Sequence, residues 1–215
     1  MSPSQRFGFA VGCAPRQRRT LQEALDGRLD AALAPLRAHL SAPLVLADSS
    51  ATAILQSAEP AFDFAVACQE AAWPTVLRFA LVTAPPAGAA GRDEAVRAKA
   101  TKVLTRMDKK QVFRFDLPNR TDEELALADA LVRLHRTLTQ EWTAARADAV
   151  RCYRRHGRQA EVAQELGVSQ QAVSQMLLGA RWRDLIAAED AMRRWLAPPA
   201  RTTLWPMRSR VPAQA

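Results

Sequence analysis

The chain has few cysteines and no long apolar run, and both features exclude classes of protein. Only three cysteines occur among 215 residues, at Cys13, Cys68 and Cys152, and none stands in a CxxC or Cys/His spacing. This pattern argues against a disulfide framework or a zinc site and is typical of free thiols in a reducing compartment. The apolar run FGFAVGCA near the start is only eight residues long, whereas a membrane helix needs about 18 or more. We therefore expect a cytoplasmic protein with no membrane partner.

Residues that common catalytic sites require are also scarce. No Asp or Glu stands between Met1 and Gln22, and neither GxxxxGK[ST] nor GxGxxG occurs in the chain. The three histidines, His39, His135 and His156, are far apart in the sequence, and we interpret each as a residue on a helix surface or at a helix end. We expect no catalytic residues, no bound metal and no cofactor.

Positive charge, in contrast, is abundant. The chain holds 30 Lys+Arg against 22 Asp+Glu, a net charge of +8. Residues 141–215 carry 12 basic and 7 acidic side chains, an excess of five, whereas residues 1–140 carry 18 and 15. Such an excess favours polyanions such as DNA or RNA as partners, although a soluble protein from an Arg-rich proteome would also show it.

The first 120 residues alternate between strand and helix patterns. Apolar runs bounded by turn residues indicate strands, including two that flank Asp48-Ser49-Ser50 as a hairpin, and leucines three or four positions apart indicate a helix that Pro35 interrupts. The expected strands and helices cover residues 7–13, 20–40, 44–47, 51–55, 59–72, 75–84, 92–107 and 111–117.

After Pro118 the pattern is helical throughout. Thr121 with Glu124 fits a capping box, and a break near Thr139 divides residues 121–157 into two or more helices. Gly157 fits a C-terminal cap, and another helix is expected over 182–196. The last residues are rich in proline and basic, and we interpret 198–215 as a flexible tail.

The stretch 158-RQAEVAQELGVSQQAVSQMLLG-179 has the pattern of a helix-turn-helix. The small Ala163 allows a second helix to cross the first, and Gly167 can adopt the positive φ of the turn. Ser169 is a natural N-cap for the second helix. Apolar residues are expected to fill the wedge between the two helices: Val162, Leu166, Val168 and Val173.

The outer face of the second helix carries side chains suited to the major groove. Glutamine can pair bidentately with adenine, and serine can donate or accept a hydrogen bond. Arginines just past this helix can bind phosphates, and a glutamine at the start of the first helix can touch a phosphate or brace the second helix. The candidate DNA-binding residues are Gln159, Ser169, Gln170, Gln171, Ser174, Gln175, Arg181 and Arg183. The same pattern also fits a helical hairpin in a bundle or a protein-docking surface.

The order of elements, together with the VGC turn that ends the first strand and the hairpin Asp48, resembles the SatD family. The resemblance implies an α+β, ferredoxin-like front domain of the nucleotidyl-cyclase type, followed by a terminal helix-turn-helix. A catalytic cyclase needs two carboxylates to hold metal on a nucleotide triphosphate. The first strand, around Phe9, has none, so Asp48 is interpreted as a turn former and the front domain as non-catalytic.

These observations predict a bacterial DNA-binding transcriptional regulator. The predicted division is a degenerate cyclase-like domain over 1–120, a connecting helix over 121–140, a helix-turn-helix domain over 141–197 and a basic tail over 198–215. Its expected partner is double-stranded DNA, bound as a homodimer, with the front domain serving oligomerisation or sensing. The alternatives are a nucleotide-binding or cyclase-type enzyme regulated by the helix-turn-helix, and a protein-docking adaptor.

Overall fold

The structure, a computed structural model, describes residues 6–14, 28–47, 50–84, 91–108 and 110–198. Several features discussed above lie outside these ranges: the beginning of the first helix, Asp48 at the hairpin bend and the tail beyond Pro198. Within the described ranges the protein combines a mixed β-sheet with helices on both faces, as the sequence predicted for an α+β fold.

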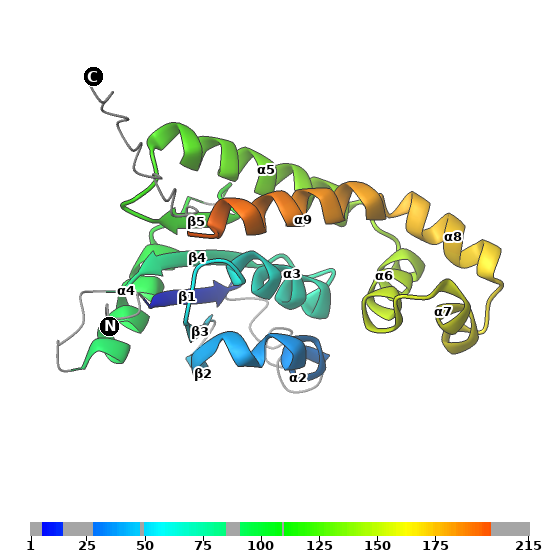
Figure 1. Ribbon diagram of the computed structural model, residues 1–215, viewed down its shortest axis with the longest axis horizontal. Helices are drawn as coiled ribbons and strands as arrows, with labels where there is room; N and C mark the ends of the chain where they lie inside the picture. The colour runs from blue at the N-terminus through cyan, green and yellow to red at the C-terminus, as the bar shows by residue number, and fades with distance from the viewer. Residues whose placement is uncertain (1–5, 15–27, 48–49, 85–90, 109, 199–215) are drawn as a thin grey trace, which may run out of the picture.

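Five strands of the described residues form one sheet (Figure 1). The central strand β1 (Phe7–Gly12) pairs antiparallel with both β3 (Ser50–Leu55) and β4 (Arg78–Thr83). On one side β2 (Leu40–Ala47) continues antiparallel from β3, and on the other β5 (Phe113–Asp116) pairs parallel with β4. The order is β2-β3-β1-β4-β5. The hairpin predicted around Asp48 is thus confirmed by the pairing of β2 with β3.

The two faces of the sheet bury different kinds of side chain. Phe9, Phe79 and Phe113 point to one face and pack together, with the Phe9 and Phe79 ring centroids 6.0 Å apart. The other face is built from small residues such as Ala10 and Ala80. Alternate side chains of a strand point to opposite faces, so each strand contributes side chains to both faces of the sheet.

Helices cover both faces. The face that carries the phenylalanines packs against α3 (Ala61–Ala72), with α2 (Arg28–Leu33) beside it, and α4 (Arg92–Thr105) covers the small-residue face. The predicted interruption at Pro35 is confirmed, because α2 gives way to a 3-10 helix over Ala34–His39. A side chain at Gly8 would place its Cβ 2.8 Å from the carbonyl oxygen of Val96, so this glycine lets α4 approach the sheet closely.

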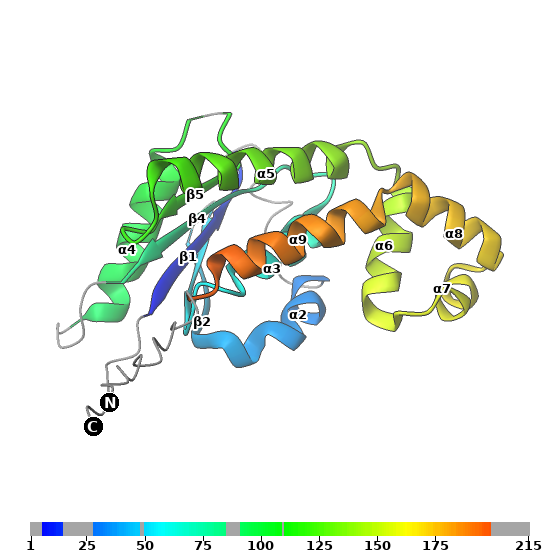
Figure 2. The same ribbon diagram turned by 45° about the horizontal axis from the view of Figure 1, so that its top comes forward.

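The second half of the chain is helical, as predicted. The helices are α5 (Asp122–Gln140), α6 (Ala144–His156), α7 (Gln159–Leu166), α8 (Gln170–Gly179) and α9 (Trp182–Leu196). Figures 1 and 2 show α5 and α9 running beside the sheet while α6, α7 and α8 lie beyond its end. Within the described ranges, no helix is long and apolar enough to cross a membrane.

Two of these helices begin or end as the sequence predicted. The Thr121 hydroxyl accepts a hydrogen bond from the Glu124 amide, and the Glu124 carboxylate accepts one from the Thr121 amide, which completes the capping box. Gly157 ends α6 at φ 72°.

The long helix α9 belongs to two apolar clusters. Its first half contributes Leu185 to a cluster formed with α6, α7 and α8. Its second half contributes Met192 and Leu196 to the core beneath the sheet. This one helix therefore connects the terminal helices to the core of the front part.

A buried charge cluster lies where these two parts meet. The Arg154 guanidinium of α6 donates to both carboxylate oxygens of Glu70 on α3, at 2.9 and 2.8 Å, and to both of Glu189 on α9, at 3.0 and 2.6 Å. His135 on α5 contacts Glu189 through Nε2 at 3.2 Å, and the guanidinium also lies over the Trp182 ring. The interpretation of His135 as a residue on a helix surface or at a helix end is wrong, because its side chain is buried. It contacts a carboxylate on α9 that lies 54 residues later in the chain, which no local pattern could indicate.

The two carboxylates of this cluster respond differently to burial. Glu70 is buried, which raises its pKa above the ordinary value despite the adjacent Arg154. Burial also opposes ionisation of Glu189, but hydrogen bonds from His135 and Arg154 outweigh it and leave its pKa below the ordinary value. Each carboxylate therefore depends on Arg154 to remain ionised inside the protein.

Replacing Arg154 should therefore destabilise the protein strongly. We expect Arg154→Met to lower the free energy of unfolding by about 3–5 kcal/mol, because it leaves two buried carboxylates without their cation. Urea denaturation at neutral pH measures this change. The matched control is Arg155→Met, whose partner Glu165 is about 41% exposed and which should cost less than about 1 kcal/mol. Equal losses from the two variants would contradict the role assigned to the cluster.

Candidate nucleic-acid interface

A tight turn at Gly167 joins α7 to α8. Gly167 has φ 65° and ψ 33°, and the Val168 amide donates to the Ala163 carbonyl at 3.1 Å. Glycine adopts this left-handed conformation without the steric cost of a Cβ. The Ser169 hydroxyl then accepts a hydrogen bond from the Ala172 amide at 3.1 Å and caps α8. The turn residue and the cap are those expected from the sequence.

The inner sides of α7 and α8 are held together by apolar packing. Val162 and Val173 are fully buried, and Leu166 packs partly buried against the same cluster. The prediction for Val168 is wrong, because this side chain is 40% exposed. It lies within the turn, where its backbone amide is bonded to the end of α7 and its side chain is left outside the wedge.

Ionic contacts fix α7 against α6. Glu165 on α7 receives the guanidinium of Arg155, the ring of His156 at 2.6 Å and the thiol of Cys152 at 3.2 Å. The hydrogen bond from His156 is the main reason that the pKa of Glu165 lies below its ordinary value. His156 at the end of α6 therefore helps to position α7.

The face of α8 that points away from this packing is polar and exposed. The exposed side chains on it are Gln170, Gln171, Ser174, Gln175 and Leu178. Ser174 and Gln175 follow Gln171 by three and four positions, which places these residues on one side of the helix. Leu178, 68% exposed, extends the same side by one further turn. Sequence reasoning missed Leu178, although its place seven residues after Gln171 indicates the shared face.

Arginines without an ion-pair partner among the described residues gather where α8 meets α9. Arg181 lies between these helices, and Arg183 lies in the first turn of α9, both exposed. Arg146 on α6 lies against the end of α8, because its Nε is 2.7 Å from the position that a Cβ on Gly179 would occupy. These three guanidinium groups are available to an external anion.

The remaining candidate residue lies apart from this face. Gln159 is the first residue of α7 and is partly buried. The structure thus places the other candidates along α8 and the start of α9, and it adds Arg146 and Leu178 beside them. Within the described part of the chain, no group of three or more His, Cys, Asp or Glu residues could hold a metal ion.

Comparisons with known proteins identify no family. No protein-family model matches the chain, and no curated protein matches it. Among solved structures, the chain is similar to the crystal structure of a regulator of polyketide synthase expression from Bifidobacterium adolescentis, at 16% sequence identity and a TM-score of 0.27. That match covers 89% of this chain and 86% of the other. A likeness at this TM-score supports no functional inference.

The backbone at Arg181 is in a strained conformation. Arg181 has φ 58° and ψ 36°, the left-handed conformation, and is the only residue other than glycine with positive φ in the described ranges. This conformation costs an L-residue roughly 1–2 kcal/mol, and glycine avoids most of that cost. An arginine at this position therefore reduces stability while presenting a cation beside α8.

We expect Arg181→Gly to raise the free energy of unfolding by up to about 1 kcal/mol, because it removes this strain. Thermal and urea denaturation measure the change. In the control, Arg183→Gly, the substitution falls in an ordinary helical turn and should lower the free energy of unfolding by about 0.5–1 kcal/mol. A loss of stability in Arg181→Gly would show that the guanidinium has a structural contact that outweighs the strain.

Proposed function

We propose that this protein is a cytoplasmic DNA-binding transcriptional regulator that reads the major groove of double-stranded DNA through α8. The observation that carries the proposal is the exposed polar face of α8. Gln171, Ser174 and Gln175 lie on one side of a capped helix and are exposed. Three exposed residues on the same helix face supply donors and acceptors that suit the edges of base pairs.

The arrangement of α7 and α8 supports this use. A helix-turn-helix needs a second helix that is packed on one side and exposed on the other. In α8, Val173 on the packed side is fully buried and Gln171 on the other side is exposed. Leu178 continues the free side and can contact a thymine methyl group. The apolar packing between α7 and α8 and the ionic contacts of Glu165 with α6 hold α8 at a fixed orientation for docking on DNA.

Phosphate binding is assigned to the arginines at the α8–α9 junction. Arg146, Arg181 and Arg183 have no carboxylate partner among the described residues, so no internal ion pair must break when DNA binds. Contacts to phosphates supply a large share of affinity without sequence preference. The face of α8 would supply specificity, and the junction would supply charge.

For the front part we propose a non-catalytic, ferredoxin-like domain related to the SatD family. The strand order β2-β3-β1-β4, with helices after β1 and β3, supports a ferredoxin-like βαββαβ core to which β5 is added. Its proposed roles are sensing and formation of a homodimer. A two-fold dimer would present two copies of α8 to half-sites about one turn, roughly 34 Å, apart.

Gln171→Ala should weaken binding to the specific operator by about 1–3 kcal/mol, because it removes a base-reading side chain while leaving phosphate contacts in place. The operator is first selected from a random DNA pool at stated salt, and both proteins are then compared on operator and random DNA. The control is Gln164→Ala, an exposed glutamine on α7 outside this face. Unchanged discrimination in Gln171→Ala would contradict the assignment of α8.

Arg183→Ala should weaken binding to all DNA sequences alike and lower the slope of log K against log salt by about one. Fluorescence anisotropy at several salt concentrations measures that slope. Arg194→Ala is the control, since Arg194 is an exposed arginine near the other end of α9. Equal slopes in wild type and Arg183→Ala would exclude a phosphate contact at Arg183.

The alternative functions predict different results. A cyclase-type enzyme would turn over a nucleoside triphosphate with Mg²⁺ or Mn²⁺ and lose that activity in Asp48→Asn. A protein-docking adaptor would retain a protein partner and show no salt-dependent retention of DNA. Either result would contradict the regulator assignment.

A further inference from the structure

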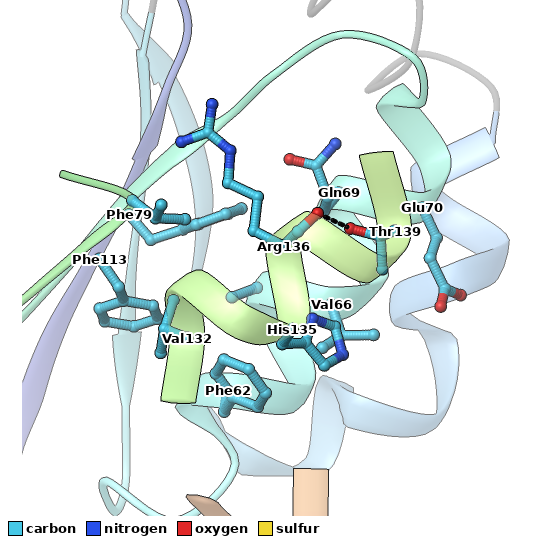
Figure 3. A pocket seen from close by; sticks show the side chains of 12 residues that line it. Phe62, Val66, Gln69, Glu70, Phe79, Phe113, Val132, His135, Arg136 and Thr139 are labelled. Carbon is cyan, nitrogen blue, oxygen red and sulfur yellow. Dashed lines mark hydrogen bonds between the residues drawn. The ribbon is translucent and has the colours of Figure 1, made fainter. Parts of the chain in front are cut away.

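A cleft between α3 and α5 contains an arginine, Arg136, that has no counter-ion among the described residues. Two cavities share lining residues there: one of about 30 Å³ beside Phe79 and Phe113 of the sheet, called the inner cavity, and one of about 120 Å³ beside Trp73, called the outer cavity. Gln69, Arg136 and Thr139 line both. Figure 3 shows Arg136 extending away from His135, past Phe79 and Gln69.

The Arg136 side chain makes no hydrogen bond and no ion pair with any described residue, although it is partly buried. Burial lowers its pKa below the ordinary value, and no neighbouring charge counteracts that effect. Guanidinium groups withdrawn from water are normally paired with an anion, because an uncompensated buried charge is costly. Arg154 follows that rule, because it is paired with Glu70 and Glu189.

The neighbouring polar groups are engaged elsewhere, and the one carboxylate among them, Glu70, is held by Arg154. The Gln69 amide is occupied at both ends, donating to the Thr75 carbonyl at 2.8 Å and accepting from the Leu77 amide at 3.0 Å. The Thr139 hydroxyl donates to the Arg136 carbonyl at 2.9 Å. These bonds hold the walls of the cleft rigid and leave the five guanidinium donors of Arg136 for a ligand.

The two cavities differ in polarity. The inner one is lined mainly by apolar side chains such as Val66, Phe79 and Val132, and it borders the sheet. The outer one is bounded by Trp73 and by the exposed amide of Gln140. A ligand that fits both therefore needs an anionic group beside Arg136 and a short apolar part that points inward.

We propose that this cleft binds a small aliphatic carboxylate, with its carboxylate on Arg136 and its chain directed into the cavity between α3 and the sheet. Guanidinium and carboxylate form paired, charge-assisted hydrogen bonds. The small volume of the inner cavity restricts the aliphatic part to a few carbons.

The position of the cleft gives such a ligand a route to the terminal helices. Glu70 and His135 line the inner cavity and also hold the Arg154 cluster that joins α6 and α9 to the front part. A ligand in the cleft would therefore contact side chains that position α6. Binding itself is independent of DNA, and only the idea that the ligand is the signal sensed by a regulator rests on the proposed function.

The test is a titration of the full chain, without DNA, with acetate, propionate, butyrate, pentanoate and hexanoate. Calorimetry gives affinities, and the NMR signal of the Trp73 indole N–H, assigned with Trp73→Phe, reports on the outer cavity. We expect affinity to rise with chain length to a maximum and then fall. Arg136→Gln should weaken the best acid by about tenfold or more, whereas Arg194→Gln, with the same charge change at an exposed site, should leave it unchanged.

A second variant tests the direction of the ligand's aliphatic chain. Val66→Ile adds one methylene to the wall of the inner cavity and should move the maximum to a shorter acid while acetate binding persists. Equal binding in wild type and Arg136→Gln, an unmoved maximum in Val66→Ile, or binding of butyramide or inorganic phosphate as tight as that of butyrate would each overturn the proposal. Because no arm of the experiment contains DNA, a failure here is distinct from a failure of DNA binding.

Discussion

The arrangement of the molecule depends on one cation held between two buried carboxylates. Arg154 on α6 lies between Glu70 on α3 and Glu189 on α9, and His135 on α5 contacts the second carboxylate. Apolar packing alone would allow these four helices to slide, since leucine and alanine surfaces are compatible with many alignments. Forked hydrogen bonds have a fixed geometry. They therefore set the orientation of α6, and with it that of α7 and α8.

The ion pairs of Arg154 also connect the two halves of the chain. The terminal helices are packed onto the front part through α9, which contributes Leu185 to one apolar cluster and Met192 to the other. Arg151 adds a further tie by donating to the Glu70 carbonyl at 3.0 Å. A change in the packing of α3 or α5 can therefore reach the exposed face of α8 through rigid elements.

Local patterns in the sequence predicted the helices and strands well and the charge cluster not at all. Apolar spacing predicted α9 at Trp182–Leu196, and the Thr121/Glu124 pair predicted the capping box of α5, because these signals lie within a few residues of each other. The Glu70–Arg154 pair joins residues 84 positions apart, and no local signal selects one arginine among many for burial. His135 was misread for the same reason, and Val168 because hydrophobicity alone does not tell which way a turn residue points.

The distribution of paired and unpaired arginines is more informative than the net charge of +8. Arg154 and Arg193 form ion pairs with carboxylates of the same chain, Arg193 with Asp63 at 2.8 Å, and these pairs contribute to folding. Arg146, Arg181 and Arg183 have no ion-pair partner among the described residues and lie near the end of α8, whose exposed face carries uncharged side chains. In the proposed function, these arginines supply the positive charge that attracts DNA. Three phosphate contacts and one helix are a small interface for a specific complex. The homodimer proposed above would double this interface on the two half-sites of an operator.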